Sequence, residues 1–227
     1  MRNLKNLIIE PSQLFLSIKE KPNWVVPFII VSVLGIALAI LMQPAQAQVS
    51  MVKLQEILPP GDVELALQRA KRLGMISASL LPLITLIRWA IISGIILMLT
   101  SLFTDKLRFK QSFSIVCYGN LILILGSAVN TGAVYLRGLE VISSPYDLWM
   151  IGLNFWSRET LGLPLSLLLS EITVFSVWYL ILIALGLIYV ANVSKWQAAF
   201  VSIVVWLLGV VFKVGLALYG TQFSPMR

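Results

Sequence analysis

The sequence predicts an all-α membrane protein, a polytopic bundle of five transmembrane helices with short interfacial helices between them. Of its 227 residues, 59% are hydrophobic and only 12% are charged, whereas soluble domains carry about 25% charged residues. The mean hydropathy is +0.92. Five apolar runs are each long enough to cross a hydrocarbon core of about 30 Å. We therefore expect a single membrane domain over residues 1–227.

The segment before the first span predicts an interfacial helix over residues 11–20. Pro11 suits the first helical position, where its missing N–H breaks no helical hydrogen bond. Three apolar residues then share one helical face: Leu14, Phe15 and Ile18. Because an amphipathic helix of this kind lies in the membrane surface, we expect Pro11, Phe15 and the following Trp24 at the cytoplasmic interface. A frayed polar tail is the alternative.

The first two spans are predicted over residues 24–42 and 80–103. The first contains no charged residue, and the second contains Arg88. A long polar segment separates them, and a Pro-Pro-Gly sequence divides that segment into two parts. The second part has apolar residues at helical spacing, which predicts an amphipathic helix on the membrane surface over residues 62–73.

The third span is predicted over residues 113–136. In the loop that follows, Ser144 to Asp147 has the pattern of a helix start, with a serine cap, proline next and an acid at the third helical position. This predicts an interfacial helix over residues 145–156. Trp149 and Trp156 belong to it, because tryptophan favours the headgroup level.

The last two spans are predicted over residues 165–190 and 198–219. Only a short polar turn, ANVSKWQ, separates them. They are therefore expected to be antiparallel neighbours.

The distribution of basic residues predicts the orientation of the chain. With the N-terminus inside, the inner segments hold eight Lys and Arg in 39 positions and the outer segments hold seven in 72. Basic residues accumulate in cytoplasmic loops. We therefore expect a cytoplasmic N-terminus and an outer C-terminus in a bacterial cytoplasmic membrane. Another intracellular membrane is the alternative.

Three ionisable residues fall inside the predicted spans: Arg88, Glu171 and Lys213. Each costs about 2.5 to 3.5 kcal/mol at mid-span, so each needs a partner, water or a route to the interface. Counted along the spans, all three and Asn130 lie about 9 to 12 Å below the outer boundary. They predict one polar layer. It is either a cation-rich pocket for a lipid phosphate or other anion, or an ion-pair cluster that fixes helix register.

The composition disfavours enzymatic chemistry. Histidine is absent and the one cysteine, Cys117, lies in an apolar run, which removes every Ser-His and Cys-His arrangement. We expect no catalytic residue, metal or cofactor. The net charge of +7 indicates contact with anionic headgroups rather than nucleic acid. The expected partners are membrane lipids, anionic ones among them, and proteins that the sequence does not identify; a homo-oligomer is also left open.

Small residues indicate where helices can approach closely. Gly126 and Gly132 are candidates within the third span.

Several stretches resemble the Yip family, the Ypt-interacting-protein domain. The sequences FSVWYLILIALGL and SKWQAAFVSIVVW, with the short turn between them, resemble the family's last two spans. FKQSFSIVCYGNLI is similar to the start of its third span. The P-x-x-x-F and P-x-W segments before its first span are matched by Pro11, Phe15, Pro22, Trp24 and Pro27. The resemblance covers nearly the whole chain and implies five spans.

The resemblance implies an integral membrane protein of prokaryotic type. Eukaryotic relatives have a long polar cytoplasmic region associated with Rab-type GTPases, whereas 23 residues precede the first span here. The resemblance supplies no catalytic residues, and implies that Trp178, Gly186 and Trp206 belong to a packing template. We expect a non-enzymatic protein that organises membranes or binds partners. The alternative is a small transporter or lipid-handling protein that uses the charged layer.

Overall fold

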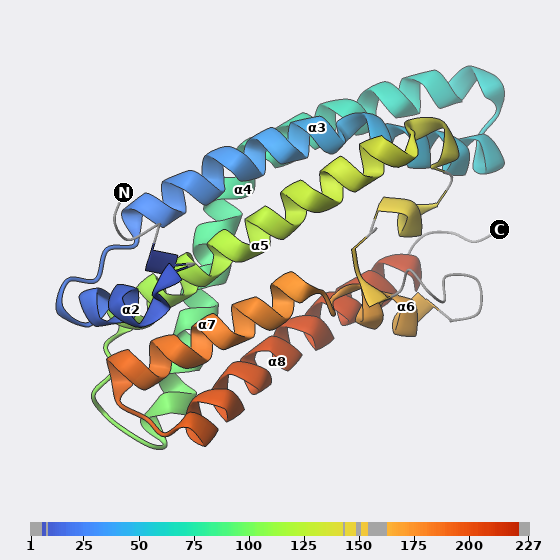
Figure 1. Cartoon of the computed structure of the whole chain (residues 1–227). Coiled ribbons are helices and arrows are strands. Elements are labelled where there is room, and N and C mark those ends of the chain that lie inside the picture. Colours follow the sequence, from blue (N-terminus) through green and yellow to red (C-terminus); the bar gives the residue numbers. More distant parts are fainter. Residues whose placement is uncertain (1–5, 8, 143, 149–150, 154–162, 223–227) are drawn as a thin grey trace.

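The computed structural model describes residues 6–7, 9–142, 144–148, 151–153 and 163–222. Within them every regular element is a helix, and five helices are long and apolar enough to cross a membrane (Figure 1). The predicted fold class, an all-α bundle with five spans, is confirmed.

The elements follow one another without a strand in the described part of the chain. In order they are α2 (Pro11–Glu20), α3 (Val25–Ile57), α4 (Pro60–Ser101), α5 (Phe109–Arg137), the short 3-10 helices η1 (Leu139–Val141) and η2 (Pro145–Leu148), α6 (Leu163–Ser170), α7 (Val174–Ala191) and α8 (Lys195–Gln222). The five spans are within α3, α4, α5, α7 and α8.

The two ends of the bundle differ in which short helix packs there, α2 at one end and α6 at the other. At one end α2 crosses the start of α5 and the turn between α7 and α8 (Figure 1). Lys19 Nζ donates to Asn192 Oδ1 at 3.1 Å, and Gln111 Nε2 donates to the Lys19 carbonyl at 2.9 Å. We call this the α2 end. The opposite end, where α6 packs beside the last part of α8, is the α6 end.

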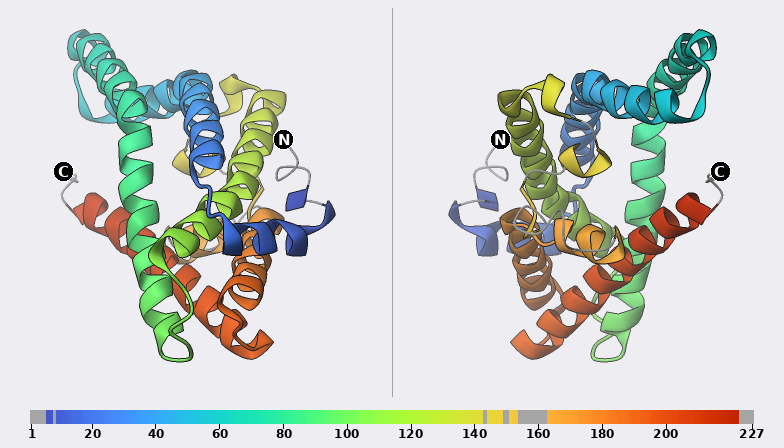
Figure 2. Two further views of the ribbon diagram at one scale, coloured as in Figure 1. Left: turned by 90° about the vertical axis from the view of Figure 1, so that its left-hand side faces the viewer. Right: turned by 90° about the vertical axis from the view of Figure 1, so that its right-hand side faces the viewer.

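The first two long helices differ from the predicted pattern. α3 continues through Pro44 to Ile57, and α4 joins the predicted surface helix at 62–73 and the predicted span at 80–103 into one helix of 42 residues. Between the two segments stands only Gly74, which a helix tolerates at a cost of about 1 kcal/mol, and no proline. At 1.5 Å per residue α4 is about 63 Å long, about twice the hydrocarbon thickness. The paired ends of α3 and α4 therefore extend past the other helices (Figure 2).

α4 changes direction along its length (Figure 1). Its first part runs beside α3, and its last part reaches α8, where the rings of Phe103 and Phe200 meet edge to face at 6.4 Å. Pro82 lies between these parts. A proline removes one helical hydrogen bond and pushes away the preceding turn, so it accounts for the bend.

The predicted fourth span, 165–190, is two helices rather than one. α6 ends at Ser170 and α7 begins at Val174. Thr173 caps α7: its Oγ1 accepts from the Ser176 N–H at 2.9 Å, and Ser176 Oγ accepts from the Thr173 N–H at 2.8 Å. This reciprocal capping box satisfies the first N–H groups of a new helix. It favours a break where the apolar pattern alone predicts continuity.

α5 is the centre of the bundle. Its residues from Ser112 to Ile122 are all buried, and it packs against α3, α4 and α7. Close approach to α7 depends on glycines: a Cβ at Gly119 would lie 3.0 Å from the Tyr179 ring, one at Gly126 2.8 Å from the Phe175 ring, and one at Gly186 2.5 Å from Ile115 Cγ2. Real Cβ atoms do not tolerate the last two distances, so at Gly126 and Gly186 a side chain of the facing helix fills the space that a Cβ would need.

Candidate functional site

Two of the four predicted layer residues form an ion pair. Glu171 directly follows α6, and Lys213 is on α8; Lys213 Nζ donates to Glu171 Oε1. The side chains are 54% exposed for Lys213 and 22% exposed for Glu171. The pair joins the break between α6 and α7 to the last helix.

The pair lies near the end of the membrane span and not deep within it. α7 has 18 residues and is about 27 Å long. Lys213 is 18 residues after Lys195, the start of α8, and so is also about 27 Å from the α2 end. Since a hydrocarbon core is about 30 Å thick, both residues come close to the boundary at the α6 end. The predicted depth of Glu171 was counted from residue 165, whereas α7 begins at Val174, so that count no longer applies to Glu171.

Asn130 belongs to a different cluster. Its Nδ2 donates to the Leu148 carbonyl at 2.8 Å, which fixes η2 against α5. In the same loop Arg137 Nη1 pairs with Asp147 Oδ1 at 3.1 Å, and Asp147 Oδ2 accepts from the Ser144 N–H at 3.0 Å. These contacts hold the segment after α5 along the end of that helix. Sequence reasoning identified Asp147 only as a capping acid, because an ion pair between two loop residues has no periodic signal.

Arg88 stands apart from the ion pair. It lies 13 residues before Ser101, the end of α4, and so about 20 Å from the α2 end. Counted along the helices, that is about 7 Å nearer to the α2 end than Lys213. Its side chain is exposed, and no carboxylate of the described residues lies within ion-pair distance of it. Its charge is within electrostatic range of the Tyr179 phenol on α7. Glu171 and Lys213 are therefore in contact, and a single layer that contains all four residues stays a prediction.

The predicted interfacial residues differ in how deeply their side chains are buried. Pro11 is the first residue of α2 and is half-buried, and Trp24 is half-buried with its ring edge to face on Phe113 at 5.3 Å. Phe15 is fully buried, because the apolar face of α2 packs on α5 and α7. The Phe15 side chain therefore faces the protein, and its position at the membrane interface stays a prediction. Trp149 and Trp156 lie outside the described residues.

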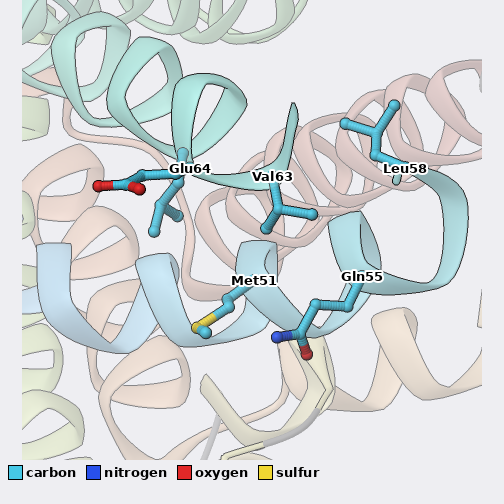
Figure 3. Close-up of a pocket in the computed structure, with 6 residues that line it drawn as sticks. Met51, Gln55, Leu58, Val63 and Glu64 are labelled. Carbon is cyan, nitrogen blue, oxygen red and sulfur yellow. The ribbon is translucent and has the colours of Figure 1, made fainter. Parts of the chain in front are cut away.

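An open cavity of about 560 Å³ lies between the extended ends of α3 and α4 (Figure 3). It is lined by Met51, Gln55, Leu58, Val63, Glu64 and Leu67. None of the four predicted layer residues contributes to this lining. In the part of the chain that the structure describes, no three His, Cys, Asp or Glu side chains gather in a way that could hold a metal ion.

Replacing Glu171 by glutamine should lower the melting temperature in detergent by about 2 to 4 °C. The change removes the counter-charge of Lys213, and a partly exposed pair of this kind contributes about 1 kcal/mol. Thermal unfolding of the purified protein measures the shift. Glu140→Gln is the control, because Glu140 is exposed and outside the spans. Equal melting temperatures for both variants would show that the Glu171 carboxylate does not stabilise the bundle.

Comparison with known proteins gives one positive result. The family model of the Yip1 domain matches residues 5–216. Comparisons with curated proteins and with solved structures give no match. The family match covers nearly the whole chain and agrees with the stretches that resemble the family's first, third and last two spans. With five helices long enough to cross a membrane, this chain is an integral membrane protein and belongs to the Yip1 domain family.

Proposed function

We propose that this protein is a non-catalytic membrane protein that organises membranes or binds partners through the extended ends of α3 and α4. The observation that carries the proposal is the length of these helices. α3 has 33 residues and α4 has 42, about 50 and 63 Å, so both exceed a hydrocarbon core of about 30 Å. Their paired ends form a hairpin beyond the bundle, residues 43–79, which we call the extended hairpin.

The surface of the extended hairpin suits contact with another molecule. It has exposed large apolar side chains outside the predicted spans, among them Leu65, Leu73, Met75 and Ile76. Exposed basic residues lie beside them: Arg69, Lys71 and Arg72. The open cavity of about 560 Å³ lies on the same hairpin. Apolar surface that is rimmed by polar residues marks sites of protein or membrane contact.

The orientation that we propose places the α2 end in the cytoplasm of a bacterial cell. Six basic residues lie there: Lys19, Lys21, Lys106, Arg108, Lys110 and Lys195. They support a cytoplasmic position because cytoplasmic segments near the span ends are enriched in Lys and Arg. The extended hairpin and the C-terminus are then on the outer side of the cytoplasmic membrane. In another intracellular membrane the same bias would face the cytosol.

Photo-crosslinking in cells tests the proposal. A benzophenone amino acid at Leu65, on the extended hairpin, should give a protein adduct of higher mass. The same amino acid at Ile91, which is 58% exposed on the membrane-spanning part of α4, is the matched control and should give none. An adduct with the mass of two copies identifies a homo-oligomer. Identical patterns at Leu65 and Ile91 would refute a role of the extended hairpin in binding partners.

A second candidate function, lipid handling, is favoured by one observation. Arg88 is exposed within the spanning part of α4, where lipid surrounds the bundle. The transporter form of this candidate receives less support, since Glu171 and Lys213 form an ion pair with each other instead of facing a solute.

A further inference from the structure

The surroundings of Arg88 are apolar. Three neighbours on α4 are more than half exposed: Ile84 at 53%, Ile87 at 53% and Ile91 at 58%. In a membrane these side chains contact acyl chains. Arg88 lies about 20 Å from the α2 end, hence about 10 Å inside the opposite boundary of a core of about 30 Å. Its charge is therefore within the hydrocarbon layer, where it needs a negatively charged partner.

The two cations in the spans differ in how they are compensated. Lys213 pairs with Glu171, and both come close to the boundary. Arg88 has no such carboxylate among the described residues. An arginine side chain can extend several Å toward the headgroups. Its guanidinium then presents a planar fork of donors at the depth to which a lipid phosphate can descend.

We propose that Arg88 binds the phosphate of an anionic phospholipid from the leaflet at the α6 end. The guanidinium donates to two phosphate oxygens, the geometry in which arginine recognises phosphate best. The acyl chains lie along Ile84, Ile87 and Ile91. An anionic headgroup matches the single uncompensated positive charge, whereas a zwitterionic headgroup brings a second cation to the site. This lipid site rests on the second candidate function, lipid handling, and deepens it by naming the ligand class and the residue that binds it; it requires no protein partner.

Native mass spectrometry of the full chain in detergent tests the site with two added lipids, phosphatidylglycerol and phosphatidylcholine. The unaltered protein should retain phosphatidylglycerol, and Arg88→Gln should reduce the retained fraction at least fivefold. Arg88→Lys keeps the charge but loses the fork, so it should retain an intermediate fraction. Lys106→Gln, which removes one exposed positive charge in the loop between α4 and α5, is the control and should retain the lipid like the unaltered protein.

Three outcomes would overturn the proposal. Equal retention by Arg88→Gln and the unaltered protein would remove Arg88 from the site. Equal losses in Arg88→Gln and Lys106→Gln would mean general attraction to basic residues. Equal retention of phosphatidylcholine and phosphatidylglycerol would exclude selection for an anionic headgroup. As an independent measurement, phosphatidylglycerol should raise the melting temperature of the unaltered protein, and this rise should be absent in Arg88→Gln. None of these results depends on whether Leu65 crosslinks to a partner.

Discussion

Gly186→Val should lower the free energy of unfolding by about 3 kcal/mol, the upper range for overpacking a core. A Cβ at this position would lie 2.5 Å from Ile115 Cγ2 and 3.0 Å from its Cγ1. Ile115 is fully buried, and its Cγ2 can move away only by rotation about χ1, which a β-branched residue in a helix strongly resists. α7 must therefore separate from α5, and the buried contacts of Leu182, Ile183 and Leu187 weaken together.

Thermal unfolding in detergent measures this loss, and two further variants assign its cause. Gly209→Val is the control on α8, where an added Cβ has nothing within 4 Å. It should change stability by a few tenths of a kcal/mol, the difference in helix propensity. Ile115→Ala removes the three atoms nearest to the new Cβ. Combined with Gly186→Val, it should therefore cost less than the sum of the two changes. Equal losses at Gly186 and Gly209, with additive behaviour, would mean that the crossing of α5 and α7 is not close.

The glycines show what spacing can and cannot predict. The sequence offers Gly126 and Gly132 as candidates for close packing. In the structure Gly126 faces Phe175, whereas an added Cβ at Gly132 meets nothing within 4 Å. The closest approach is at Gly186, which the family resemblance places in a packing template. Spacing identifies small residues, but which of them faces another helix depends on the rotation of each helix in the bundle.

The number of spans was predictable because it follows from the length and composition of apolar runs. Where a helix starts and ends was less so. Residues 171–173 form a short break between α6 and α7, and Thr173 and Ser176 cap the start of α7 there. The break interrupts an apolar run whose hydropathy is continuous. In α4 the reverse occurs, since a polar segment and an apolar segment form one helix. The hydropathy of a segment indicates whether it lies in the membrane or in water, but it does not show whether the helix is continuous.

The predicted depth of each residue in the polar layer depends on where the helices start and end. Depths counted from the edges of predicted spans carry the error of each edge, and the edge of the fourth span moved by nine residues, from 165 to Val174. Glu171 and Lys213 are nevertheless in contact, because they lie at the same end of neighbouring helices. Asn130 has a different partner. Asn130 is held by the Leu148 carbonyl, a contact with an irregular loop that has no helical spacing to reveal it.

Phe15→Ala should release α2 from the bundle and make the bond after Lys19 at least tenfold more sensitive to trypsin. Truncation of a buried phenylalanine costs about 3 to 5 kcal/mol, and Phe15 is fully buried with Leu14 and Ile18. A helix of ten residues is not stable alone in water, so α2 depends on this packing. Its hydrogen bonds to the rest of the bundle, from Lys19 to Asn192 and from Gln111 to the Lys19 carbonyl, are partly or fully exposed and are too weak to replace this packing.

The variant Leu16→Ala tests whether α2 is held by packing on the bundle or by attachment to the membrane. Leu16 is 43% exposed on the opposite face of α2, so Leu16→Ala should leave cleavage after Lys19 at the rate of the unaltered protein. If α2 were held mainly by lipid, its exposed face would carry the attachment. Leu16→Ala would then increase cleavage and Phe15→Ala would not. Rates of cleavage in native membrane vesicles, with the fragment identified by its mass, distinguish the two cases. Because the buried face of α2 contacts α7 and α5, we expect the larger effect at Phe15.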